Sequence, residues 1–171
     1  MNRIILLLTA LLLFNYCTLQ TPRKKGIDIQ VNILKKLTLN EIKYSKDTLG
    51  KAYYSLSIDI FNNTDSIMYF WTMSCSWEVN WFFNTESLHI FVGDCNFNSP
   101  IIKQIESGKK LTYKSIVCVN ENLDIIKELK VGFLLIHKNE MSGGDDIYKV
   151  LRRKLNRQQD IIWSDPFKID K

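Results

Sequence analysis

Apolar and polar residues alternate with a period of two along most of the chain from Ile27 onward. Successive side chains of a β-strand point to opposite faces, so this pattern predicts strands with one face toward a core and the other toward water. The predicted strands cover residues 27–33, 54–60, 67–81, 88–92, 111–119, 131–137 and 161–169.

The longest alternating run, from Ile67 to Trp81, exceeds the usual 3–10 residues of a strand, so we expect a bulge or bend near Ser74–Ser76. Its apolar phase is Ile67, Tyr69, Trp71, Met73, Cys75, Trp77, Val79 and Trp81. We expect burial for this phase. Phe70, Phe82 and Phe83 fall outside it and are the candidates for an exposed carbohydrate platform.

One segment has helical spacing instead. Residues 146–158 follow Asp145 and Asp146, which can cap a helix N-terminus. The apolar residues expected to rest on the sheets are Ile147, Val150, Leu151 and Leu155. The cations expected to face solvent are Lys149, Arg152, Arg153 and Arg157. These four are either a solvated face or a contact for an anionic partner, phospholipid or protein.

The spacing predicts an all-β fold of seven to eight strands with one short helix inserted before the last strand. Regular helical crossovers between strands are absent from the pattern, which favours an antiparallel β-sandwich over a parallel sheet. Residues 131–137 are apolar on both faces, so this strand is expected to be central. Ser107-Gly108 has the chemistry of a corner turn. No internal repeat is evident, and residues 27–171 are interpreted as a single domain.

The N-terminal segment has the pattern of an export signal. Arg3 precedes an apolar run from Ile4 to Phe14, which is short for a membrane-spanning helix. We therefore predict a signal peptide over residues 1–16, a lipidated Cys17 and a basic tether over residues 17–26. Tyr16 departs from the small residue that usually precedes a lipidated cysteine, which leaves cleavage nearby by a general signal peptidase as the alternative. The expected location is the periplasm, the outer membrane or the cell surface.

Several segments together resemble a known group of proteins. They are the signal segment, the Asn62-Asn63-Thr64-Asp65 turn after a Ser-Leu-Ser-Ile-Asp-Ile strand, the Met-Ser-Cys-Ser-Trp stretch and the terminal Ile-Trp-Ser-Asp-Pro. With them the chain resembles small exported Ig-like β-sandwich proteins, often lipoproteins, of Bacteroidetes-type bacteria. The resemblance implies an Ig-like architecture and an envelope location. It implies no catalytic residue.

Four cysteines are present, and Cys17 is set aside as the lipidation site. An exported fold permits disulfides. Cys75 and Cys95 are both expected at one end of the sandwich, and Cys118 lies within an apolar strand. We favour a Cys75–Cys95 bridge, with the other two pairings left open. Cys118 is interpreted as a buried free thiol.

The remaining chemistry is sparse. The chain has no nucleophile elbow, phosphate-binding loop, dinucleotide fingerprint or zinc-protease motif, so we expect no enzyme activity, cofactor or metal site. Cys118 with His137 as base is the weaker, catalytic interpretation of that thiol. A net charge of +5 is too small to require a nucleic-acid partner.

Three function classes follow. The leading one is a non-catalytic envelope protein, a monomeric binding or assembly module that is held at the membrane by its lipid and binds a protein or glycan partner. The second is a protease inhibitor that acts through the loop Asn96–Pro100. The third is a hydrolase with an unrecognised site.

Overall fold

The computed structural model describes residues 26–42, 52–91, 97–120, 128–142, 144–158 and 160–169. Within them the chain forms nine strands, one α-helix and three short 3₁₀ helices. The strands are β1 (Gly26–Leu37), β2 (Ala52–Asn63), β3 (Met68–Met73), β4 (Trp81–Phe83), β5 (Leu88–Phe91), β6 (Pro100–Ile105), β7 (Lys110–Val119), β8 (Val131–Leu134) and β9 (Ile161–Trp163). The helices are η1 (Leu39–Glu41), η2 (Trp77–Asn80), η4 (Lys138–Glu140) and α2 (Ile147–Arg157).

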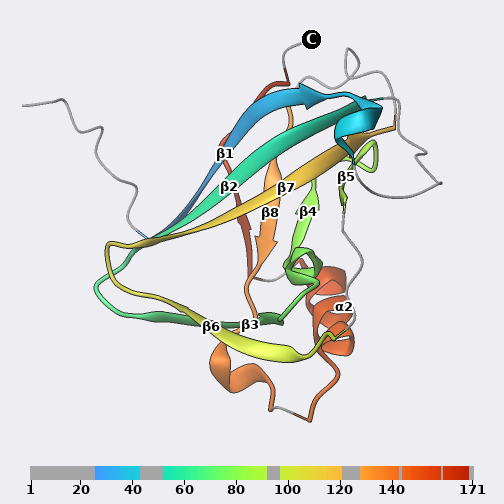
Figure 1. Cartoon of the computed structure of the whole chain (residues 1–171). Coiled ribbons are helices and arrows are strands. Elements are labelled where there is room, and N and C mark those ends of the chain that lie inside the picture. Colours follow the sequence, from blue (N-terminus) through green and yellow to red (C-terminus); the bar gives the residue numbers. More distant parts are fainter. Residues whose placement is uncertain are drawn as a thin grey trace, which may run out of the picture.

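The strands form two antiparallel layers, which confirms the predicted all-β sandwich (Figure 1). One layer has the order β1-β2-β7-β5. The other contains β4-β8-β9 and the pair β3-β6, joined where Phe70 bridges His137 just after β8. If β3 and β4 are taken as one interrupted strand, the layers have the strand order of an immunoglobulin constant-type sandwich, with β6 added beside β3. The helix α2 precedes the last strand, as predicted.

The bend predicted near Ser74–Ser76 is a complete interruption. Phe70 pairs with His137 and Trp81 pairs with Phe133. The short stretch 133–137 therefore faces the much longer stretch 70–81. The extra residues leave the sheet as η2. Asn80 fills the gap, because its buried side-chain amide donates to the carbonyls of Trp71 at 3.1 Å and Leu134 at 3.0 Å. One side chain therefore replaces the missing backbone hydrogen bonds.

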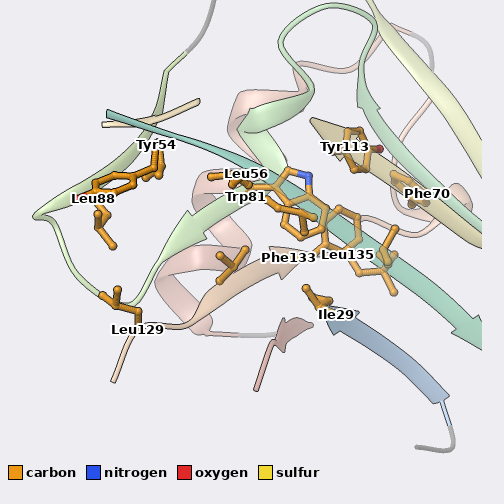
Figure 2. Packing of buried hydrophobic residues seen from close by; sticks show 14 of the residues in the cluster. Ile29, Tyr54, Leu56, Phe70, Trp81, Leu88, Tyr113, Leu129, Phe133 and Leu135 are labelled. Atoms are coloured by element: carbon orange, nitrogen blue, oxygen red, sulfur yellow. The ribbon is translucent and has the colours of Figure 1, made fainter. Parts of the chain in front are cut away.

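Aromatic side chains form the centre of the core between the two layers. The Trp81 ring lies 4.6 Å from Phe133 and 5.5 Å from Tyr113, and Phe70 meets Phe133 edge to face at 5.2 Å. Figure 2 shows Trp81 and Phe133 in the middle of the cluster. Edge-to-face and tilted rings of this kind add to the stabilisation from apolar burial.

A second apolar cluster covers the outer face of the β3–β8 layer, where α2 packs against it. It contains Trp71, Met73, Leu134, Ile136, Met141, Ile147, Val150 and Leu151. The helix therefore buries one face of β3, and the sandwich core buries the other. The predicted phase of this run is wrong at its start: Met68 and Phe70 face the core, and Ile67 is exposed. A strand that is apolar on both faces carries no clear alternation, and a one-residue shift exchanges its faces.

The α-helix begins and ends close to the predicted limits. Asp146 is the N-cap, and its carboxylate accepts a hydrogen bond from the backbone N–H of Tyr148. The buried face contains Ile147, Val150 and Leu151, as predicted. The predicted burial of Leu155 is wrong: Leu155 is exposed, and Lys154 is buried in its place. The ammonium of Lys154 is paired with the carboxylates of Glu140 and Asp160, and this pairing offsets the cost of burying a charged side chain at this position.

Two further differences concern strands. β6 was not predicted; it starts at Pro100, which is tolerated as the first residue of a strand. β9 is shorter than the segment predicted, and Ile162 rather than Trp163 faces the core. With β6, and with the long run divided into β3 and β4, the part of the chain that the structure describes has nine strands. None of the described helices is long and apolar enough to cross a membrane.

Candidate functional site

The exposed face of α2 is strongly basic. Lys149, Arg152, Arg153 and Arg157 are all exposed, as predicted, and none of them forms a salt bridge with a described residue. All four line a shallow groove of about 420 Å³, together with Asn156. Tyr148 and Leu155 add exposed apolar area on the same helix. The buried residues of α2 hold this face rigidly on the sandwich.

Beneath α2 lies an ionic cluster that the sequence analysis missed. The ammonium of Lys154 contacts Glu140 at 2.5 Å and Asp160 at 2.8 Å, and its side chain is only 5% exposed. Burial by itself raises the pKa of Glu140, but hydrogen bonds from the Lys154 ammonium and from the backbone N–H of His137, together with the positive charge of Lys154, lower it below the usual value.

The same cluster has the spacing of a metal site. His137, Glu140 and Asp160 bring ligand atoms within 4.8 Å of one another. Lys154 already supplies the positive charge that both carboxylates need. The chemistry of the set is therefore that of a buried lysine paired with two partly exposed carboxylates, and it gives no support for a metal ion.

The loop proposed for protease inhibition is anchored against residues 74–76, which follow β3. Residues 97–100 of it are described, and Asn96 lies outside the described residues. The side chain of Asn98 accepts hydrogen bonds from the backbone N–H groups of Cys75 at 3.3 Å and Ser76 at 3.2 Å. Backbone bonding between Ser74 and Ser99 adds a further contact at 2.8 Å. Phe97, next to this anchor, is 91% exposed.

The aromatic residues expected to form a platform are separated by the fold. Phe70 is fully buried, so its expected exposure is wrong. Phe82 and Phe83 are half-buried and line a groove of about 590 Å³ beside β4. Trp163, which the alternation had placed in the core, joins them there.

Cys118 is the buried free thiol that the sequence predicts. It is 2% exposed, and burial raises its pKa. Its cross-strand neighbours are Tyr53 and His89, and not His137. The side chain of Asn120 contacts those of Cys118 and His89. A buried neutral thiol is a poor nucleophile. Cys75 is not a free thiol, but Cys95 lies outside the described residues, so their pairing stays a prediction.

The signal peptide, Cys17 and the tether up to Lys25 also lie outside the described residues. The corresponding expectations of export and acylation stay predictions.

Comparisons with known proteins add little. No family model matches the sequence, and no curated protein matches it. Among solved structures, the chain is similar to a FixG-related protein from Vibrio parahaemolyticus, with a TM-score of 0.35 and 8% sequence identity. The alignment covers 86% of this chain and 100% of that chain. A likeness at this TM-score carries no weight for fold or function.

Proposed function

We propose that this protein is a non-catalytic module of the cell envelope, exported and lipid-anchored at Cys17, whose helix α2 docks on anionic phospholipid headgroups. The observation that carries the proposal is the exposed cationic face of Lys149, Arg152, Arg153 and Arg157, which form no salt bridge with any described residue.

The exposed apolar residues of α2 favour a lipid surface over a soluble polyanion. Leu155 and Tyr148 are 41% and 46% exposed beside the cations. A helix in the membrane interface places apolar side chains at the acyl boundary, while long cationic side chains reach the headgroups. A soluble polyanion would offer no apolar surface for the side chain of Leu155. A tether of about ten residues would keep the domain within roughly 35 Å of the bilayer.

Vesicle binding tests the proposal. A soluble form that begins after Cys17 is sedimented with vesicles of phosphatidylglycerol or phosphatidylcholine at low and high salt. We expect binding to phosphatidylglycerol only, and weaker binding at high salt. Changing Arg152 and Arg153 to Ser removes about 1 kcal/mol for each charge, which weakens binding roughly 30-fold. Leu155→Ser should also weaken it.

The control changes two exposed lysines elsewhere, Lys109 and Lys114, to Ser, which keeps the total charge equal to that of the arginine variant. It should bind almost as the unchanged protein does. Equal weakening by the two double variants would show that net charge, and not α2, drives binding. The anchor is tested separately: labelled palmitate should enter the full chain and not its Cys17→Ser variant.

A second candidate function, protease inhibition, rests on the Phe97 loop. Inhibitors present one exposed side chain on a rigid loop, and Phe97 with its anchored neighbours Asn98 and Ser99 has this arrangement. An aromatic side chain fits the hydrophobic pocket of chymotrypsin-type proteases. If the loop is inhibitory, the protein inhibits such an enzyme and Phe97→Ala abolishes the effect, while Tyr148→Ala does not. Absence of inhibition by the unchanged protein would remove this candidate.

A further inference from the structure

The groove beside β4 carries two acidic side chains, Glu78 and Glu86. It is lined by β4, the turn to β5, β5 itself, and one side chain each from η2 and β9. Among the described residues its lining includes Glu78, Glu86 and His89 but no lysine or arginine, although the chain has 23 basic and 18 acidic residues. A groove with two carboxylates and no described lysine or arginine complements a positively charged ligand.

One wall of this groove is a fixed aromatic pair. Phe82 of β4 and Trp163 of β9 meet edge to face at 5.2 Å across the central strand β8. They can do so because Gly132 lies between them: a Cβ there would come within 2.9 Å of the Phe82 ring and 3.0 Å of the Trp163 ring. Trp163 is 43% exposed, so its ring is accessible to a ligand.

The carboxylate of Glu78 is partly withdrawn from water on the same groove. Burial raises its pKa, and hydrogen bonds from its own backbone N–H and from Ser76 offset this only in part. No described lysine or arginine pairs with it. A half-buried carboxylate without a cation carries a desolvation cost that a positively charged ligand would relieve.

We propose that this groove binds an organic cation, an alkylammonium or guanidinium group, between the Phe82–Trp163 wall and Glu78. The ring faces attract a cation through their quadrupoles, and the attraction strengthens where water is excluded. Glu78 adds a direct charge interaction at reduced dielectric. A neutral sugar could stack on Trp163 but would leave the charge of Glu78 unbalanced. The inference is independent of the membrane contact proposed for α2, which lies on other residues.

Titration with small probes tests the proposal, with the indole N–H resonance of Trp163 as the signal and the full chain in a mild detergent. The probes are N-acetyl-arginine methylamide, N-acetyl-lysine methylamide, putrescine, N-acetyl-citrulline methylamide and methyl glucoside. We expect the cationic probes to shift the resonance, and citrulline, a neutral isostere of arginine, to bind at least tenfold more weakly. Tighter binding of the amino-acid derivatives indicates a protein partner's side chain, and tighter binding of putrescine indicates a free amine. Equal binding of arginine and citrulline derivatives, or binding of the glucoside alone, overturns the proposal.

Variants localise the effect. Glu78→Gln keeps the shape of the side chain and removes its charge, and should weaken cation binding at least tenfold. Its matched control is Glu106→Gln, an exposed carboxylate outside the groove. Trp163→Ala should abolish binding measured by calorimetry, whereas Tyr69→Ala, at an exposed aromatic residue outside the groove, should not. Unchanged cation binding in Glu78→Gln, with its amide spectrum otherwise intact, contradicts the proposal.

Discussion

Single buried polar side chains hold together places where the β-structure of this protein is interrupted. Asn62, at the end of β2, is fully buried and donates to the carbonyls of Ser66 at 2.7 Å and Ile105 at 2.8 Å. The side-chain oxygen Oδ1 of Asn62 accepts hydrogen bonds from the backbone N–H and the hydroxyl of Thr64. Asn80 has the corresponding role between Trp71 and Leu134. The Asn-Asn-Thr-Asp turn is therefore an internal anchor as well as a turn.

We expect Asn62→Ala to lower the free energy of unfolding by about 2–3 kcal/mol, because buried carbonyls lose their donors. Urea denaturation measures the loss. Asn63→Ala is the matched control: Asn63 is the next residue, it is half-buried, and none of the described hydrogen bonds involves its side chain. Similar losses in both variants would show that the turn backbone, and not the buried amide, provides the stability.

Lys154 is the second residue whose role depends on burial. Lys154→Met should destabilise the fold by about 2 kcal/mol at neutral pH, less than for a fully buried pair because both of its carboxylate partners are partly exposed. Lys149→Met, on the exposed face of the same helix, should change stability by less than about 0.5 kcal/mol. Equal effects of the two substitutions would contradict the importance of the ionic cluster.

This cluster also predicts a pH dependence. The folded state lowers the pKa of Glu140 below its usual value of 4.5, so the ion pair stabilises the protein above that pH. The contribution should be lost as the pH falls below about 4.5 and Glu140 takes up a proton. Stability curves of the unchanged protein and Lys154→Met, measured by thermal unfolding from pH 7 to pH 3, should therefore converge on acidification. Parallel curves would show that Lys154 does not lower the pKa of Glu140.

At the scale of elements, β8 is the strand on which the second layer depends. It pairs with β4 and β9, its inner face contacts the core, and its outer face contacts α2 and the aromatic wall. The wall closes over Gly132, where any side chain would displace two rings. A glycine within a central strand is normally unfavourable, and here the rings of the neighbouring strands fill the space it leaves.

We expect Gly132→Ala to cost about 1–3 kcal/mol through overpacking. It should also shift the Trp163 indole resonance, since the added Cβ displaces the Phe82 and Trp163 rings. Gly144→Ala is the matched control, because a Cβ added there has no neighbour within 4 Å. A stable Gly132→Ala variant with an unchanged Trp163 signal would show that the wall is loosely packed.

At the scale of the whole molecule, the state of the cysteines tests whether a disulfide links two segments of the sandwich and whether the protein folds in an oxidising compartment. We predict that peptide mapping without reduction links the Cys75 and Cys95 peptides. Closing this loop would stabilise the fold by about 3 kcal/mol in the chain-entropy model. Cys118, which is 2% exposed, should react with an alkylating reagent only after denaturation. Detection of a Cys75–Cys118 link would contradict both the pairing and the burial.

Much of the architecture follows from local pattern alone. The period of two predicted an antiparallel sandwich, and β1, β2, β7 and a central β8 lie where it placed them. The turn before β7 and the helix with its Asp146 cap were also predicted, because turn and capping preferences depend on a few adjacent residues.

Which face of a strand or helix is covered, and by what, was decided only by the tertiary structure. Alternation shows that a strand has two different faces, but β3 is apolar on both, and the packing of α2 on one of them assigned Trp71 to the helix and Phe70 to the core. Lys154 could replace Leu155 inside because Glu140 and Asp160 meet it there from other segments. The groove likewise brings Trp163 together with Glu78 and Phe82, which lie far from it in the chain. Sequence patterns record what each segment prefers, whereas partners distant along the chain are brought together only by folding.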